Sequence, residues 1–241
     1  LSHARPAALS VRTQGRALVA KQGLRQAAVH AGPDAGLSIF ALGGGGSSRY
    51  TTGSHVDLDS FSMMAGAAWN SSTLHKDDYG LWTAGAFFEA GWGNYNTRGS
   101  GVDGDGSANY YGGGILGRYQ APFNAYAEAS FRIGHLDSDF SSDDIINFAT
   151  GETADYDTDG TYYGAHFGLG YIWNITDRAS LDVSTKYLWT RLEGDKVSVA
   201  GDDVDFDDAD SQRWRTGARF SYAIESEQLR VTPYVGAAFE Y

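Results

Sequence analysis

Apolar and polar residues alternate with a period of two along most of the chain after Gly36. In the stretch 123–134, one parity carries alanine, phenylalanine and isoleucine, whereas the other parity carries Glu128 and Arg132. Successive side chains of a β-strand point to opposite faces, so this stretch predicts a strand with one apolar and one polar face. The alternation recurs and predicts nine strands, at residues 36–48, 56–69, 79–94, 108–120, 123–139, 160–173, 180–193, 210–223 and 229–241.

The predicted strands are long, and aromatic residues gather near the ends of their apolar faces. Their length is about 12 to 16 residues, whereas globular strands usually have about 5 to 6 and a tilted strand crossing a bilayer needs roughly 9 to 11. Trp82 and Trp92 end one apolar face, and Tyr171 and Trp173 end another. A soluble core can show the same alternation, but it would use more Val, Ile and Leu than these alanine-rich faces contain. The pattern predicts an all-β protein, a transmembrane up-and-down antiparallel β-barrel.

The alternation also assigns residues to the two faces, except in the first and fourth strands, whose many glycines leave the parity ambiguous. The residues expected to face lipid are Trp82, Ala86, Phe88, Phe131, Phe167, Tyr171 and Trp214. The residues expected to line a hydrated lumen are Glu89, Glu128, Arg132, His166, Lys186, Arg213, Arg215, Arg219 and Glu240.

The connections between the predicted strands alternate in length. Long polar segments occupy residues 95–109, 141–160 and 194–210, whereas "QAP", "NITDRA" and "IESEQ" are short. Outer-membrane barrels have short periplasmic turns and longer external loops. We therefore expect the long segments to be external loops, and the first strand to run from the periplasm to the outside.

Nine is an odd number of strands, and bacterial single-chain barrels close with an even number. An open sheet edge in lipid leaves backbone groups unpaired at a cost of several kcal/mol each. We expect that an odd number of C-terminal strands, most simply three, is missing from this chain. The alternative is that the count is wrong by one strand.

Residues 7–30 predict a helix, because Ala, Leu, Gln and Arg favour helices and Gly32-Pro33 is a stop signal. Its basic residues lie on opposite sides, so it is better surrounded by water or polar walls than laid on an apolar surface. We expect a lumen helix within residues 1–35, leading into a barrel at 36–241, where Glu89, Glu128 and Glu240 can meet its basic side chains. The lumen-helix residues expected to make these contacts are Arg12, Arg16, Lys21 and Arg25.

Charge is divided unevenly along the 241 residues, whose formal net charge is −12. All 30 acidic residues follow residue 33, and the body of the chain is therefore strongly acidic, which argues against a nucleic-acid partner. The absence of cysteine excludes disulfides and thiolate metal sites. No apolar run is long enough for a transmembrane helix. No signal peptide is visible in the sequence, and we expect Leu1 to be a boundary or a processed end.

Motifs for catalysis or cofactors are weak. "DYDTDG" at 155–160 matches the opening of a calcium loop, but the twelfth position holds His166 instead of glutamate. "GGGG" at 43–46 lacks the lysine and helix of a phosphate loop, and no nucleophile elbow G-x-S-x-G occurs. We expect no catalytic residue, metal or cofactor, and we interpret the acidic segments as solvated loops. The row Arg213, Arg215 and Arg219 is either a positive stripe that tunes passage or a charge balance for Glu240.

Several segments taken together resemble the β-domain of autotransporters, the translocators of type V secretion. The resemblance covers about residues 15–241, and its segments include "GLWTAGAFFEAGWGNYNT", "YYGGGILGRY", "WRTGARFSYA" and "VTPYVGAAFEY". It implies a twelve-strand barrel in the outer membrane of a Gram-negative bacterium, with a helix through the pore. It also implies a passenger domain in cis, exported to the cell surface, and assembly by the barrel assembly machinery.

The sequence departs from the family pattern in two respects. Tyr241 is aromatic but lies in the wrong strand to be the family's terminal aromatic residue, and residues 1–33 contain no asparagine for passenger cleavage. The alternatives are a stand-alone outer-membrane adhesin or small porin, and a soluble all-β protein.

Overall fold

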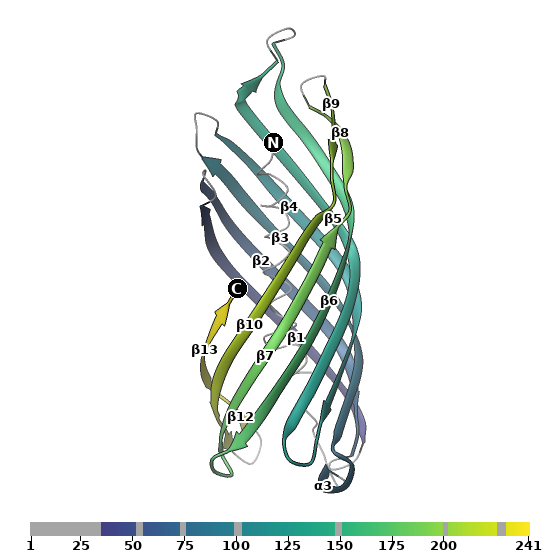
Figure 1. Ribbon diagram of the computed structural model, residues 1–241, viewed down its shortest axis with the longest axis vertical. Coiled ribbons are helices and arrows are strands. Elements are labelled where there is room, and N and C mark those ends of the chain that lie inside the picture. The colour runs from purple at the N-terminus through teal and green to yellow at the C-terminus, as the bar shows by residue number, and fades with distance from the viewer. Residues whose placement is uncertain are drawn as a thin grey trace.

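The computed structural model describes residues 35–51, 55–72, 76–98, 103–147, 151–199, 202–225 and 230–241. Nine strands in this part form one antiparallel sheet, in which each strand pairs with the next long strand along the chain (Figure 1). These strands are β1 (Gly36–Thr51), β2 (His55–Asn70), β3 (Leu81–Arg98), β4 (Gly104–Gln120), β5 (Ala125–Ile146), β6 (Thr153–Asn174), β7 (Ala179–Leu192), β10 (Ala209–Tyr222) and β13 (Tyr234–Glu240).

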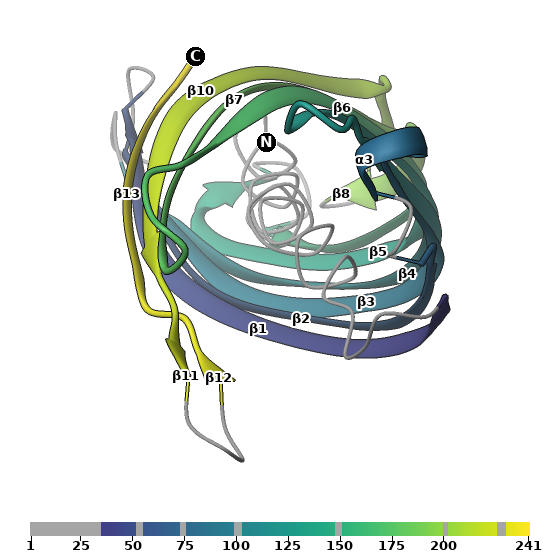
Figure 2. The ribbon, with the colours of Figure 1, turned by 90° about the horizontal axis from the view of Figure 1, so that it is seen from below.

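The sheet curls around its long axis into an incomplete barrel (Figure 2), which confirms the predicted all-β, up-and-down architecture. Its edge strands are β1 and β13, and no ladder joins them within the described residues. All nine predicted strands overlap observed ones. The connection between β10 and β13 carries a small hairpin of β11 (Ile224–Glu225) and β12 (Arg230–Val231). The helical residues in the described ranges form one short element, α3 (Lys76–Tyr79).

The prediction of long loops was wrong for most of the residues concerned. β5 and β6 are 22 residues each, and their ladder continues to the pair Ser142↔Ala154. The "DYDTDG" segment lies inside β6 and is extended, so it is neither a calcium loop nor a solvated loop. The reason is the alternation of its residues. Asp155 and Asp157 are exposed to solvent, whereas Tyr156 and Thr158 are buried, so the segment has one polar and one buried face, as a strand requires. The 194–210 segment likewise contains a hairpin, β8 (Asp195–Val199) and β9 (Asp202–Phe206).

The two faces of the wall exchange polarity along its length. We call the end where β1 joins β2, β3 joins β4 and β5 joins β6 the loop end, and the opposite end the turn end. On β3 the outward residues are apolar or aromatic from Trp82 to Trp92, and they are polar from Asn94 to the loop end. On β2, which runs the opposite way, the outward residue changes from Phe61 to Asp59 toward the loop end. Near the loop end the inward side chains become apolar, forming a buried cluster of Val56, Leu58, Tyr95, Ala108, Tyr110, Leu136, Phe140, Ala154, Tyr156, Tyr162, Leu192 and Val199.

The wall therefore has two zones. In the lower zone, between the turn end and Trp92, the outward face is apolar and the inward face carries charges. In the upper zone, beyond Trp92, the outward face is acidic and polar, and the inward face is apolar. The β8–β9 hairpin belongs to the upper zone and packs Val197, Val204 and Phe206 against the inner cluster.

Glycines in the inner wall make room for aromatic rings that lie flat across neighbouring strands. A Cβ atom at Gly134 would lie 2.5 Å from the ring and hydroxyl of Tyr162, and one at Gly66 would lie 2.6 Å from Phe40. Real Cβ contacts do not approach so closely, so any side chain at these glycines would displace the ring. The glycine-rich strands are thus specified by the close approach of large residues on adjacent strands.

Candidate functional site

The charged inner face of the lower zone contains two buried ion-pair groups, and the first is centred on Glu89 of β3. Arg132 of β5 donates from Nη1 to Glu89 Oε2 at 2.8 Å, and the Tyr162 hydroxyl of β6 donates to Glu89 Oε1 at 2.9 Å. Arg132 is 1% exposed and Glu89 is 2% exposed. Both charges are therefore removed from bulk solvent and depend on each other.

The sheet register explains how these residues meet across several strands. Glu89 pairs with Gly112, Gly112 with Gly134, and Gly134 with Tyr162. Because the two middle positions carry no side chain, the Tyr162 ring lies over them and its hydroxyl reaches Glu89. The glycines of β4 and β5 thus create the space in which the ion-pair group forms.

The second group is centred on Glu128 of β5, and here too a glycine on the intervening strand lets side chains meet. Arg118 of β4 donates from Nη1 to Glu128 Oε2 at 3.1 Å, and Lys186 Nζ of β7 pairs with Glu128 Oε1. Gly168 lies between Glu128 and Lys186 in the register, which lets the lysine reach across β6. His166 Nε2 lies 3.6 Å from Glu128 Oε1. Nearby, the Tyr126 hydroxyl donates to Asp182 Oδ1 at 2.8 Å.

A third, more exposed group lies on β10 and the edge strand β13. Arg213 Nη1 is 3.1 Å from Glu240 Oε1, and Arg215 Nη1 is 2.9 Å from Glu240 Oε2. The expected proximity of Glu240 and Arg213 is confirmed, and it favours charge balance over a free positive stripe. Arg219 lies over the ring of Tyr234, 3.4 Å from its centroid, where the guanidinium interacts with the ring face.

The predicted lumen residues all lie on the inward parity of their strands. Glu89, Glu128, Arg132 and His166 are buried, while Lys186 and the three arginines of β10 are partly buried and Glu240 is exposed on the edge strand. Partners in the described wall hold Glu89, Glu128 and Glu240, whereas the sequence had suggested basic residues of the N-terminal segment as their partners. The residues of that prediction, Arg12, Arg16, Lys21 and Arg25, lie outside the described part of the chain.

Sequence reasoning missed Arg118 because it lies in the glycine-rich β4, whose parity was ambiguous. The signal that identifies it is the row Arg118–Glu128–Gly168–Lys186, in which opposite charges flank a glycine. This row requires the strand register, which the sequence alone does not supply.

The outward face of the lower zone carries the residues predicted to face lipid. Trp82 is 55% exposed and Phe88 is 53% exposed. Ala86, Phe131, Phe167 and Trp214 are exposed as well, and Tyr171 is partly buried. Aromatic rings pair at both borders of this belt: Trp82 with Tyr119 and Tyr171 with Trp173 toward the turn end, and Phe61 with Trp92 and Tyr187 with Trp214 toward the loop end.

The height of this belt follows from strand geometry. The distance from Trp82 to Trp92 is about 33 Å along β3, at about 3.3 Å per residue. A tilt of about 45° reduces this to about 23 Å across the membrane, close to the apolar band of roughly 25 Å in outer-membrane barrels.

None of the helical residues described here forms a segment long and apolar enough to cross a membrane. Within the same ranges, no group of three His, Asp or Glu side chains is placed to hold a metal ion. The "GGGG" run lies in the middle of β1, with no helix following it. The buried acids use their oxygens in the ion pairs and hydrogen bonds given above.

A curled antiparallel sheet with an apolar outward belt and a charged, glycine-spaced inner wall defines an outer-membrane β-barrel. The model of the autotransporter β-domain family matches residues 37–241, and the chain belongs to this family. The resemblance seen in the sequence is thereby confirmed, and the chain is an outer-membrane translocator domain.

Two solved structures illustrate the shared fold. The translocator domain of the autotransporter NalP from Neisseria meningitidis superposes with a TM-score of 0.68 at 15% identity, covering 98% of this chain and 77% of that chain. The β-domain of the Bordetella autotransporter BrkA gives a TM-score of 0.60 at 16% identity, covering 86% of this chain and 80% of that chain. A search of curated protein sequences gives no match to this chain.

Proposed function

We propose that this domain anchors an N-terminal passenger in the outer membrane of a Gram-negative bacterium and provides the route by which the passenger reaches the cell surface. One observation carries the proposal: the same stretch of wall is apolar outside and charged inside. Such a wall separates acyl chains from a hydrated bore, and most of its inward charges are paired with charges on neighbouring strands. A bore of this kind offers few unpaired charges that would hold a passing polypeptide.

We further propose that the loop end faces the outside of the cell and that the lower zone is the part within the bilayer. Trp82, Ala86, Phe88, Phe131, Phe167, Tyr171 and Trp214 then contact lipid. Residues 1–35 are proposed as the lumen helix and linker, and residues 36–241 as the barrel. The basic side chains of Arg12, Arg16, Lys21 and Arg25 would share the bore with the charged inner wall.

The remaining partners follow from membership of the family. We propose that the barrel assembly machinery inserts the domain, that the passenger is attached in cis, and that the domain binds neither cofactor nor nucleic acid. Its function is transport and anchoring without catalysis. The alternative function, a stand-alone outer-membrane adhesin or small porin, differs from a translocator in one testable respect. Such a barrel would not export a segment fused to its N-terminus.

The test is to place a secretion signal and an epitope before Leu1 and to express the fusion in a Gram-negative host. Surface protease added to intact cells should remove the epitope, and outer-membrane fractions should contain the barrel. The comparison variant is Phe131→Arg, which places a charge in the lipid-facing belt and should weaken both signals. An epitope that stays protected in intact cells, while the barrel is folded in the outer membrane, contradicts export and leaves only the membrane assignment.

A further inference from the structure

Two neighbouring inward side chains of β5 are buried although some of their polar atoms have no hydrogen-bond partner. Arg132 uses Nη1 for Glu89, but its Nε and Nη2 atoms have no acceptor among the described residues. Ser130, the next inward residue toward the turn end, likewise leaves its hydroxyl without a partner there. Arg132 is 1% exposed and Ser130 is 7% exposed. Buried polar atoms without a partner are costly, so we expect a group beyond the described wall to satisfy them.

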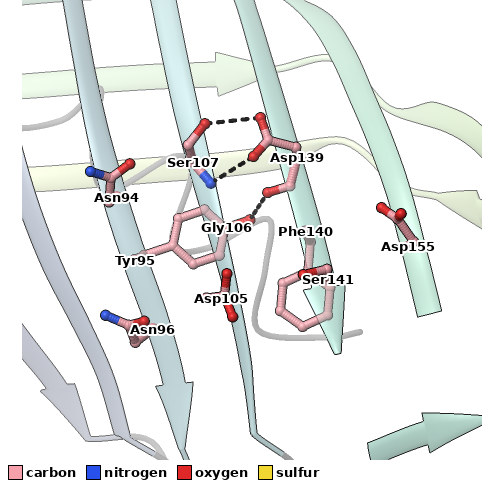
Figure 3. Close-up of a pocket in the computed structure, with 10 residues that line it drawn as sticks. All are labelled: Asn94, Tyr95, Asn96, Asp105, Gly106, Ser107, Asp139, Phe140, Ser141 and Asp155. Atoms are coloured by element: carbon pink, nitrogen blue, oxygen red, sulfur yellow. Dashed lines mark hydrogen bonds between the residues drawn. The ribbon is translucent and has the colours of Figure 1, made fainter. Parts of the chain in front are cut away.

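Polar side chains on the same strands do find partners in the upper zone. Ser107 of β4 donates from its amide and its hydroxyl to the carboxylate oxygens of Asp139 on β5, at 3.1 and 2.9 Å (Figure 3). The Tyr95 hydroxyl of β3 donates to the carbonyl oxygen of Asp139 at 3.0 Å. Neighbouring strands thus supply acceptors where the fold itself uses a donor, and the unused donors of Arg132 depart from this rule.

The unused atoms of Arg132 lie together on one edge of its guanidinium. Nε and Nη2 form a planar fork of two donors, which fits an oxygen acceptor closely. Glycine flanks Arg132 in the register on both sides, as Gly114 of β4 and Gly164 of β6. The Phe87 ring covers the first of them, since a Cβ atom at Gly114 would lie 2.6 Å from it. On the β6 side, Gly164 places no side chain in the row of Arg132, so another segment can approach the backbone there.

The two unsatisfied side chains define the chemistry of their partner. Their Cα atoms are about 7 Å apart along the strand. A side-chain carboxamide satisfies both, because its oxygen accepts from the fork of Arg132 while its nitrogen donates to the hydroxyl oxygen of Ser130. A carboxylate would fit the fork as well, but an apolar side chain would leave both residues unsatisfied.

The N-terminal segment is the part of the chain that can supply this group. It is 34 residues long and leads directly into β1 at the turn end, whereas the other stretches outside the described residues have two to four residues each and join strand ends. Residues 1–33 contain no aspartate or glutamate, so they cannot form an ion pair with Arg132. A neutral carboxamide of this segment is therefore the expected partner.

The height of Arg132 in the wall selects one glutamine. Arg132 lies about 23 Å along β5 from Ala125, where the strand begins, and this is about 16 Å in height at a tilt of about 45°. A helix rises about 1.5 Å per residue, so the height corresponds to about 11 residues. Counted back from His30, where the predicted helix ends, this level falls near residue 19. Within one helical turn of that level, at residues 16–22, Gln22 is the one residue with a side-chain oxygen.

We propose that Gln22 accepts a hydrogen bond from the unused edge of Arg132 and thereby fixes the height of the N-terminal segment in the bore. The inference rests on the lumen position proposed above for this segment. Arg132 then serves two partners, because Nη1 holds Glu89 within the wall and the opposite edge holds the segment. Since the group that is held is neutral, added salt should not release the segment.

The test measures how often the segment leaves the bore of the whole folded chain in detergent micelles, with folding checked by heat-dependent gel mobility. Trypsin cuts after Arg16 and Arg25 when the segment is out. The cleavage rate, divided by that of the same segment as a free peptide, therefore reports the open fraction. Gln22→Leu should raise this ratio about tenfold through the loss of one hydrogen bond to a charged group. Gln14→Leu, about 12 Å further along the helix, is the matched control and should leave the ratio unchanged.

Arg132→Lys separates the two roles of the arginine, because a lysine can still pair with Glu89 but has no second edge. In the Arg132→Lys background, Gln22→Leu should have no further effect on the ratio. The inference is overturned if Gln22→Leu and Gln14→Leu behave alike, or if Gln22→Leu acts equally in both backgrounds, while the lumen position of a protected segment still stands. A wild-type segment that is cut as fast as the free peptide overturns that lumen position together with the inference.

Discussion

Replacing Arg132 with methionine tests whether the inner wall depends on its buried ion pairs. The change removes the charge and the donor that holds Glu89 Oε2 at 2.8 Å while keeping most of the side-chain volume. At an effective dielectric constant of about 20, two unit charges at this distance attract by about 6 kcal/mol. Desolvation of the two ions offsets much of this gain, but removing one partner leaves the other buried without compensation, at a cost of about 3 to 5 kcal/mol.

The measurement is urea unfolding of the refolded domain in micelles, followed by tryptophan fluorescence and by heat-dependent gel mobility. Arg132→Met should lower the free energy of unfolding by the amount above, and Glu89→Gln should also destabilise the fold. The double variant should recover most of the loss, because it leaves neither charge buried alone, and this gives a coupling energy of about 2 kcal/mol or more.

An exposed ion pair in the same sheet provides the matched control. Arg49 Nε lies 2.5 Å from Asp57 Oδ1, but the Arg49 side chain is 67% exposed. Solvent screens such pairs, so Arg49→Met should produce no measurable change in unfolding. If Arg132→Met is as mild as this control, or if the two inner changes simply add, water reaches the Glu89 group and the reasoning fails.

Three further predictions follow from the wall. Gly134→Ala should lower the free energy of unfolding because its Cβ atom would meet Tyr162, whereas Gly117→Ala, with its nearest neighbour at 3.9 Å, should be tolerated; chemical denaturation of both variants checks this. Burial raises the pKa of Tyr95 to about 12, so the unfolded state ionises first and this group should cost about 2 kcal/mol of stability as pH rises from 10 to 12. Tyr95→Phe should remove that part of the pH dependence of unfolding, and an unchanged dependence would contradict it. Phe131→Arg, in the middle of the outward belt, should cost about 2 to 4 kcal/mol in lipid vesicles, and equal stability in vesicles would show that this face does not contact lipid.

The strands and their parity could be predicted because alternation needs no knowledge of neighbours. Trp82 and Glu89 differ in parity, and their environments differ accordingly. The upper zone was misread for a physical reason: there the exposed parity is acidic and the buried parity is apolar, so segments such as "DYDTDG" have the composition of loops while keeping the alternation of strands. In this zone the periodicity of the sequence indicates the strands more reliably than its composition does.

The ion-pair groups could not be predicted, because they depend on which residues share a row across the sheet. Glu128 and Lys186 are far apart in the chain and meet only because Gly168 lies between them in the register. Glycine is neither clearly apolar nor polar, so the sequence does not show which face of a strand a glycine lies on. The positions that allow these contacts therefore could not be assigned to the inner wall.

The long upper zone has a consequence for where a chain leaves the molecule. β5 continues from His135 to Ile146 beyond the apolar belt, which is about 36 Å along the strand and about 25 Å in height at the same tilt. The paired strands therefore extend well beyond the apolar belt, and the loop end of the domain has a hydrogen-bonded rim above the membrane surface. A passenger exported as we propose would start to fold well above the lipid headgroups, at a distance comparable to the diameter of a small domain.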